Sequence, residues 1–183
     1  CGASKSDLFP AKYFLERNAK KLQISHYTAN EFNYATPANL GPQTIVISAS
    51  LGGTTPETVE ANHVAKEHGA HVVSLTRSTN SPLTKEADYV IIHGFSESYA
   101  AKLQKTGYAL ELAVELLQQI EGYEYYDDMV EGFKHIYDLC NQAATTVLKD
   151  AQTFANRYKD DPVIYVMSSG ATTEVAYSTS ICL

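Results

Sequence analysis

Short apolar runs alternate with stretches of helical spacing in the first half of the chain. The run at residues 44–47 is predicted to be a strand buried on both faces of a sheet, and the runs at residues 71–76 and 88–92 are predicted to be further strands. Helical patterns at residues 56–69 and 82–87 separate these runs. Strands that alternate with helices predict a parallel sheet joined by right-handed crossovers.

Further patterns lie on either side of this central unit. Aromatic residues recur at helical spacing in residues 9–21, and residues 23–27 and 29–34 are predicted to form a short strand and a short helix. A long helix is expected from residue 99, and an acidic, tyrosine-rich segment at residues 122–128 is expected to end it.

The last third of the chain predicts one long helix and then a new strand-to-helix unit. From Met129 to Tyr158 the apolar residues recur at steps of three and four, which is typical of a single amphipathic helix that connects two domains. Residues 163–167 are predicted to be a buried strand, followed by a small-residue loop and a helix.

The loop after the first central strand carries the clearest candidate chemistry. Residues 48–55 are almost all Ser, Thr, Gly and Ala, and Pro56 suits the first turn of a helix. We expect the Thr55 hydroxyl to cap that helix. Free amides and hydroxyls at the positive end of a helix predict a phosphate site, although many loops of this type bind nothing. Neither a Walker loop nor a Gly-x-Gly-x-x-Gly fingerprint is present.

Composition narrows the possible partners. The chain has 183 residues, with 21 acidic and 14 basic residues and a net charge of −7, which argues against a nucleic-acid surface. Three widely spaced cysteines favour a reducing, cytoplasmic environment. No apolar run is long enough for a membrane span, and the histidines lack metal-site spacing. We therefore expect no membrane partner, no metal and no cofactor.

Both ends of the chain look cut. It begins with Cys1 and no preceding strand, and it stops inside an apolar helical pattern at Leu183. Residues 1–4 and 169–172 share the order small residue, Gly, Ala, hydroxyl residue. This echo predicts a second copy of the same α/β unit, although chance similarity between two short loops is a fair alternative.

Seven short motifs, in order along nearly the whole chain, resemble the sugar isomerase (SIS) domain family. The resemblance is closest to the bacterial tandem-SIS fructosamine deglycases, which split phosphorylated Amadori products such as fructoselysine 6-phosphate into glucose 6-phosphate and an amine. The ordered set carries the resemblance more than any single motif does. The motifs are residues 1–4 (CGAS), 10–13 (PAKY), 29–32 (ANEF), 54–59 (TTPETV), 81–83 (SPL), 169–171 (SGA) and 176–182 (AYSTSIC).

The resemblance implies the architecture. We expect a flavodoxin-like α/β fold, a three-layer α-β-α sandwich with a parallel sheet, then a connecting helix and the start of a second SIS domain. Residues 1–122 would be the first domain without its N-terminal strand, residues 123–160 the connector, and residues 161–183 the truncated second domain. A homo-oligomer is expected by resemblance only.

The family's phosphate-binding positions carry over unevenly. Ser4 matches the hydroxyl of the first loop, and Ser50 and Thr55 match the first and last hydroxyls of the main phosphate loop. Gly52 departs, because the usual Ser-x-Ser-Gly pattern is replaced by Ser-Leu-Gly-Gly. Backbone amides at Gly52 and Gly53, or the Thr54 hydroxyl, are expected to compensate; weaker affinity, a shifted substrate and lost activity are the alternatives.

Other candidate residues are less directly implied. Ser169 and Thr172 are possible ligand contacts from the second domain, and Lys105 could reach an anion but is expected to be a solvated lysine. In the deglycases the acid/base Glu lies on the first helix of the second domain, with a His further on. We expect both to lie beyond Leu183, so the catalytic residues of this chain are unknown.

The sequence therefore predicts the sugar-phosphate-binding part of a deglycase that acts on phosphorylated fructosamines. Two alternatives stay open. One is an aldose–ketose isomerase like the isomerase domain of glucosamine-6-phosphate synthase, and the other is a non-catalytic sugar-phosphate sensor.

Overall fold

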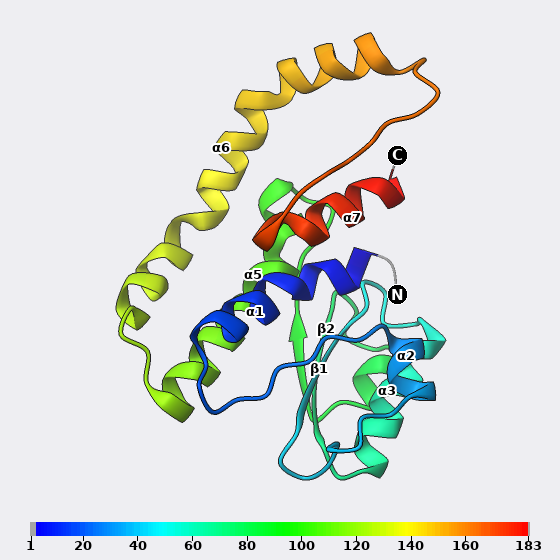
Figure 1. Cartoon of the computed structure of the whole chain (residues 1–183), viewed down its shortest axis with the longest axis vertical. Coiled ribbons are helices and arrows are strands. Elements are labelled where there is room, and N and C mark those ends of the chain that lie inside the picture. The colour runs from blue at the N-terminus through cyan, green and yellow to red at the C-terminus, as the bar shows by residue number, and fades with distance from the viewer. Residues whose placement is uncertain (1–2, 183) are drawn as a thin grey trace.

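A three-stranded parallel sheet lies at the centre of the computed structural model, which describes residues 3–182 (Figure 1). The strand order is β1-β2-β3, and Ile45 pairs with His71 and Val73 with Tyr89. The central strand is buried along its length after His71, whereas Ile45 on the neighbouring strand is 44% exposed. The three strands predicted for the central unit are confirmed, although β1 is only partly buried: β1 (Ile45–Ala49), β2 (His71–Thr76) and β3 (Tyr89–Ile92).

Helices cover both faces of the sheet. On one face Leu15 and Leu117 pack with Leu75, and on the other Phe32 and Ala65 pack with the central strand. The fold is thus the expected three-layer α-β-α sandwich with a parallel sheet. The helices are α1 (Ala3–Asn18) and α5 (Tyr99–Glu121) on the first face, α2 (Ala29–Tyr34) and α3 (Pro56–Glu67) on the second, and the short α4 (Pro82–Lys85).

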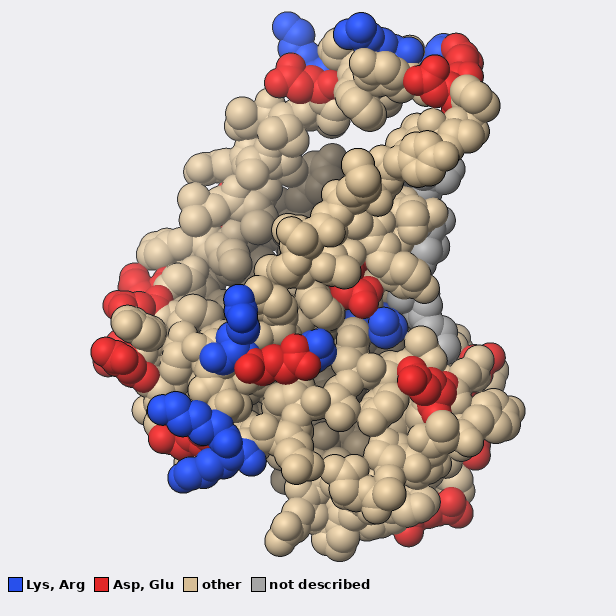
Figure 2. Space-filling model, viewed as in Figure 1, with Lys and Arg blue, Asp and Glu red and all other residues tan. Residues whose placement is uncertain are grey.

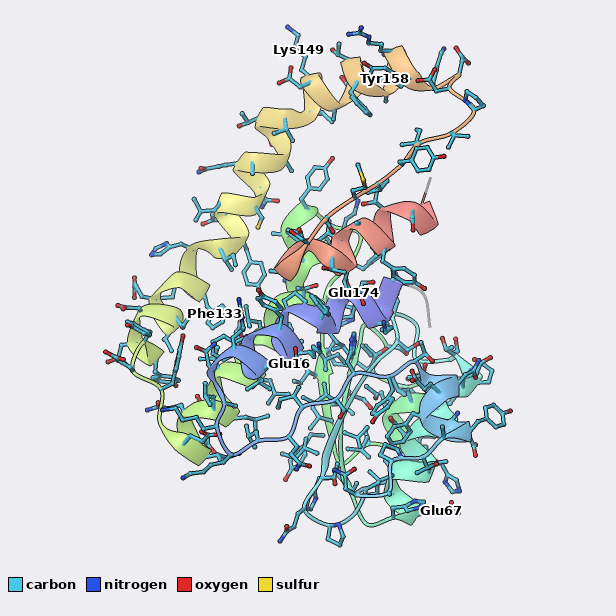
Figure 3. All side chains as sticks on the ribbon, viewed as in Figure 1. Glu16, Glu67, Phe133, Lys149, Tyr158 and Glu174 are labelled. Carbon is cyan, nitrogen blue, oxygen red and sulfur yellow. The ribbon has the colours of Figure 1, made fainter. Side chains whose placement is uncertain are left out.

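The predicted connector is a single helix, α6 (Tyr126–Tyr158). Gly122 separates it from α5 with a φ of +77°, a conformation that glycine adopts without strain. Tyr137 anchors α6 through a hydrogen bond to Glu111 of α5. Beyond this contact α6 runs away from the sheet, so that Lys149 and Tyr158 lie far from the sandwich (Figures 1 and 3).

Two predicted strands are wrong. Residues 23–27 and 163–167 are extended but belong to no sheet. In the second segment Tyr165 is 85% and Met167 89% exposed, so the run is not buried either. A strand needs a neighbour to satisfy its backbone amides and carbonyls, and the described residues place none beside either segment.

The chain returns to the sandwich after residue 167. A 3-10 turn, η1 (Gly170–Thr172), leads into α7 (Thr173–Cys182), which confirms the predicted loop and helix. This last helix lies against α1 (Figure 1). Figure 2 shows charged side chains at the far end of α6 and almost none over residues 163–169.

Candidate functional site

The loop between β1 and α3 forms a compact, internally bonded turn. Ser50 is 4% exposed, and its amide donates to the Leu75 carbonyl, which ties the loop to β2. The hydroxyls of Ser50 and Thr55 lie 3.1 Å apart and share one hydrogen bond. Thr55 occupies the N-cap position of α3, but the prediction that its hydroxyl caps the helix is wrong, because that hydroxyl pairs with Ser50 instead.

This turn leaves donors available. One hydrogen bond between two hydroxyls uses one of their two hydrogens, so the Ser50–Thr55 pair retains one for another acceptor. Within residues 3–182 no hydrogen bond reaches the amide nitrogens of Gly52 and Thr54. Both amides lie next to the N-terminus of the twelve-residue helix α3, where a negative charge is favoured. The loop can therefore bind an anion through backbone amides and a hydroxyl.

The two glycines of the loop differ in their surroundings. Gly53 has a φ of +67°, and a β-carbon there would lie 2.1 Å from Ser81 Oγ. Ser81 is 2% exposed, and the Leu83 amide donates to the Gly53 carbonyl at 3.0 Å, which holds the loop against the start of α4. Gly52 has an ordinary φ, and a β-carbon there would meet only Thr54 Oγ1 at 3.6 Å. A side chain is therefore sterically allowed at Gly52 and excluded at Gly53.

Ser4 comes from a different element than the sequence predicted. The expectation that it lies in a loop is wrong, because α1 begins at Ala3 and Ser4 is in its first turn. Ser4 lines a cavity of about 220 Å³ together with Ala49 at the end of β1 and Thr58 in the first turn of α3. The starts of two helices thus face one space at the carboxyl edge of the sheet.

Most of this cavity is a groove along the free edge of β1. Its walls are β1 on one side and the extended residues 23–28 on the other, with Leu8 of α1 and Phe32 of α2 closing it. Only the end of the cavity near Ser4, Ala49 and Thr58 is close to the loop at residues 50–55.

Lys105 is buried, so the prediction of a solvated lysine is wrong. Its exposure is 7%, and its Nζ lies 2.5 Å from Asp7 Oδ2 and 3.1 Å from Ser4 Oγ. A charged ammonium is costly to bury without partners, and the two side chains from α1 supply them. The sequence held a signal for this position, because Lys105 replaces a small residue in the buried series Ala101, Ala109, Ala113 at steps of four.

His93 also reaches the carboxyl edge of the sheet. It follows β3, and its amide donates to the Thr76 carbonyl. The ring is 4% exposed; Nδ1 donates to the Gly94 carbonyl at 2.7 Å, and Nε2 has no partner among the described residues. Burial lowers the pKa of His93 below its usual value, and the nearby charge of Lys105 lowers it further.

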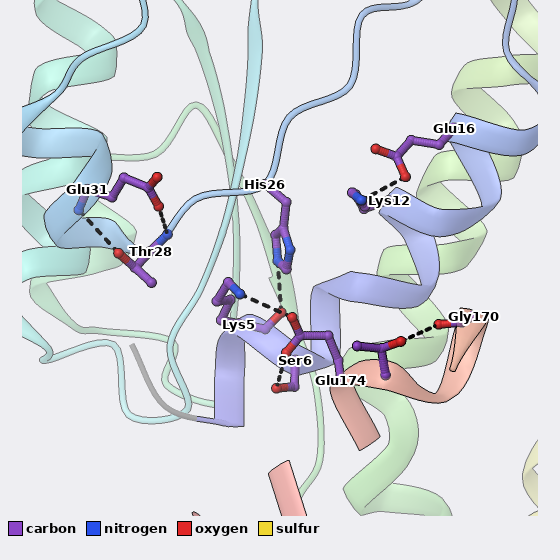
Figure 4. A network of polar contacts seen from close by, with 10 residues as sticks. Lys5, Ser6, Lys12, Glu16, His26, Thr28, Glu31, Gly170 and Glu174 are labelled. Atoms are coloured by element: carbon purple, nitrogen blue, oxygen red, sulfur yellow. Dashed lines mark hydrogen bonds and ion pairs between the residues drawn. The ribbon is translucent and has the colours of Figure 1, made fainter. Parts of the chain in front are cut away.

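A polar network joins α7 to the first turns of α1 (Figure 4). Glu174 accepts a hydrogen bond from Lys5 Nζ at 3.1 Å and another from Ser6 Oγ at 3.0 Å. His26 lies on the other side of this turn, with Nε2 3.0 Å from the Lys5 carbonyl. Burial opposes ionisation of Glu174, but the bonds from Lys5 and Ser6 outweigh it and lower the pKa of this carboxyl. No local pattern in the sequence indicates that these segments meet.

Ser169 and Thr172 lie apart from the loop at residues 50–55. The Thr172 hydroxyl donates to the Ser169 carbonyl at 2.9 Å, and both side chains are exposed. Their turn meets α1 at Tyr13, nine residues from Ser4 and therefore about 14 Å further along the helix. The structure does not bring these two residues together with Ser4 and the loop at residues 50–55.

Two other kinds of site are absent from residues 3–182. Among residues 3–182, no group of three or more His, Cys, Asp or Glu side chains is arranged to hold a metal ion. No helix of the described chain has the length and apolar character that a bilayer crossing requires.

Comparisons with known proteins identify the relatives of this chain. The SIS domain profile matches residues 11–117. Fructosamine deglycase FrlB of Bacillus subtilis (strain 168) is 33% identical over all 183 residues of this chain. A glutamine–fructose-6-phosphate aminotransferase [isomerizing] from Thermotoga maritima is 32% identical over 128 residues, which cover 67% of this chain and 21% of that protein.

A solved structure matches the fold over the whole chain. A protein from Salmonella typhimurium LT2, assigned as a phosphosugar isomerase, superposes with a TM-score of 0.95 and 41% identity, covering 100% of this chain and 55% of that one. The chain spans 56% of the length of the Bacillus subtilis deglycase. Since the profile covers more than half of the chain and the structural match covers all of it, the protein belongs to the SIS domain family.

Proposed function

We propose that this chain is the phosphosugar-binding part of an enzyme that converts a ketosamine 6-phosphate into glucose 6-phosphate and an amine. The observation that carries the proposal is the loop between β1 and α3, where free amides and a Ser50–Thr55 hydroxyl pair meet the N-terminus of a helix. The similarity to a fructosamine deglycase over the full length of the chain favours this substrate class.

In this reaction the chain's own residues hold the substrate. The phosphate would lie at residues 50–55 and Ser4, and binding energy gained there would orient the sugar carbons that react. Deglycation then needs a base that moves a proton between C1 and C2 of the open-chain sugar. We propose that this base lies outside residues 3–182.

The domain organisation is part of the proposal. Residues 1–122 would form the first SIS domain, residues 123–160 the connector, and residues 161–183 the start of a second SIS domain. An additional strand would fill the groove along β1 and pair with it, which would also give residues 23–27 a neighbour. Hydrogen exchange of the β1 amides, slow in the full-length protein and fast in the 183-residue chain, would support this arrangement; equal rates would contradict it.

Assembly and location follow the same resemblance. We propose a homo-oligomer that works in the cytoplasm; the exposed apolar side chains of α6, such as Leu139 and Phe154, offer surface for such contacts. Light scattering of the full-length protein tests the oligomer, and a monomer at all concentrations would contradict it.

The direct test of function uses the full-length protein with fructoselysine 6-phosphate and an enzymatic assay for glucose 6-phosphate. We expect product from the natural protein and strongly reduced substrate affinity in Ser50→Ala. Binding without product would instead favour the sugar-phosphate sensor, which the missing hydroxyl at Gly52 keeps open. Conversion of fructose 6-phosphate to glucose 6-phosphate in place of deglycation would favour the aldose–ketose isomerase. Absence of any sugar-phosphate binding would refute all three.

A further inference from the structure

The buried Lys105 has a specific relation to Ser4 that its burial alone does not explain. Its ammonium is enclosed between α5 and α1, where Asp7 supplies a carboxylate and Ser4 a hydroxyl. Asp7 is also the acceptor for Thr106 Oγ1 at 3.4 Å, so its two oxygens are both engaged. The carboxylate is sufficient to neutralise the lysine, and the bond to Ser4 is an additional contact.

The chemistry of the two groups fixes the direction of that bond. A lysine ammonium carries three donors and no acceptor, so Ser4 Oγ must accept from Nζ. The single hydrogen of the Ser4 hydroxyl then remains for another acceptor. In the described part of the chain no residue takes it.

The available hydrogen is at the edge where an anion is expected. Ser4 lies in the first turn of the sixteen-residue helix α1 and shares a cavity wall with Ala49 and Thr58. A hydroxyl that accepts from a cation is a stronger donor to an anion, because the two hydrogen bonds polarise each other. An anion on Ser4 would thus interact with Lys105 through one intervening atom.

We propose that Lys105 is a positioning residue of the phosphate site: it holds the Ser4 hydroxyl as a donor toward the ligand's phosphate and favours a dianion over a monoanion. This inference rests on the function proposed above. Ser4 and the loop at residues 50–55 offer only neutral donors to a phosphate. The proposal therefore attributes any preference of the site for a doubly charged ligand to Lys105, which lies behind Ser4.

The rival explanation is that Lys105 only ties α5 to α1. Under that explanation Lys105→Met costs stability and changes affinity equally for every sugar ester. Under the proposal Lys105→Met weakens the binding of glucose 6-phosphate, a dianion, at least tenfold. It weakens the binding of glucose 6-sulfate, a monoanion, less than threefold. Calorimetric titration of the full-length protein and its variants, with thermal unfolding of each, separates the two.

Two further variants keep the test decisive if Lys105→Met does not fold. Asp7→Asn removes the neutralising carboxylate but leaves Lys105 and Ser4 in place, so we expect glucose 6-phosphate to bind more tightly even though the protein loses stability. Ser4→Ala should bind glucose 6-phosphate more weakly. The double variant Ser4→Ala, Lys105→Met should lose little more affinity than either single variant.

The outcomes assign failure to one claim or the other. If the natural protein does not bind glucose 6-phosphate, the proposed function is wrong and this inference falls with it. If it binds, but Lys105→Met lowers affinity for both esters equally, or Asp7→Asn weakens the phosphate ester, Lys105 is a structural tie and the inference alone is overturned.

Discussion

Gly52 offers the sharpest test of the phosphate loop, because the structure allows the missing hydroxyl to be restored. A β-carbon at this position meets only Thr54 Oγ1, at the ordinary contact distance of 3.6 Å. The backbone φ of Gly52 is not in the left-handed region. We therefore expect Gly52→Ser to fold normally and to place a hydroxyl beside the Thr54 side chain.

The gain can be estimated from one hydrogen bond to a charged group, which contributes about 1.5–3 kcal/mol. Since about 1.4 kcal/mol is a tenfold change in affinity, we expect glucose 6-phosphate to bind at least about tenfold more tightly. Gly52→Ala is the matched control. It changes the backbone entropy of the unfolded chain in the same way, about 0.4–1 kcal/mol in favour of folding, but adds no donor.

Gly53 provides the opposite control one residue away. Its φ of +67° and a would-be β-carbon 2.7 Å from Ser81 Cβ make any side chain unfavourable. Gly53→Ala should therefore destabilise the protein by about 1–3 kcal/mol. Titration calorimetry and thermal unfolding measure both effects. If Gly52→Ser binds glucose 6-phosphate no better than Gly52→Ala, the phosphate does not lie at this loop.

Three further predictions concern stability. Gly107→Ala should cost about 1 kcal/mol in chemical unfolding, instead of the usual gain for a helix interior, since its β-carbon would lie 2.1 Å from Tyr137 Oη and 2.9 Å from Tyr137 Cζ; in a Tyr137→Ala background, which removes both atoms, Gly107→Ala should no longer be destabilising. Glu121 accepts from the amide of Lys21 at 2.8 Å, which holds the pKa of this carboxyl below its usual 4.5. The contribution of Glu121 to stability is complete above pH 4.5 and is lost as the pH falls through the lower folded-state pKa. In Glu121→Gln the free energy of unfolding should therefore fall less steeply with pH below 4.5, and an unchanged slope would contradict this. Glu174→Ala should speed hydrogen exchange throughout α7, whereas loss of the exposed Glu16 should not, and equal effects would rule out Glu174 as the tie to α1.

The parallel sheet and its helices could be predicted from local patterns because the strands are short, β-branched and separated by helical spacing, whereas the three-layer arrangement was implied by the family resemblance. Each of these signals lies within one element, so the strand at residues 71–76 was predicted with its observed ends. The loop at residues 50–55 was predicted for the same reason, since its small and hydroxyl residues are consecutive in the sequence.

The failed predictions share a cause. Residues 23–27 and 163–167 have strand-like composition, but a strand exists only beside another, and composition does not supply the neighbour. The Thr55 hydroxyl could cap its helix or meet Ser50, and only the fold of the turn decides between these bonds.

The sequence by itself determined the sheet, the helices that cover it, the continuous helix α6 and the donor-rich loop that follows β1. Those features depend on residue spacing within about thirty positions and on the preferences of each residue type. Only the tertiary structure decided the surroundings of Ser4, because Lys105 is 101 residues away in the chain and Glu174, which anchors the same turn of α1, is farther still. A charge can be buried only where distant segments bring it a partner, and no local pattern records that meeting.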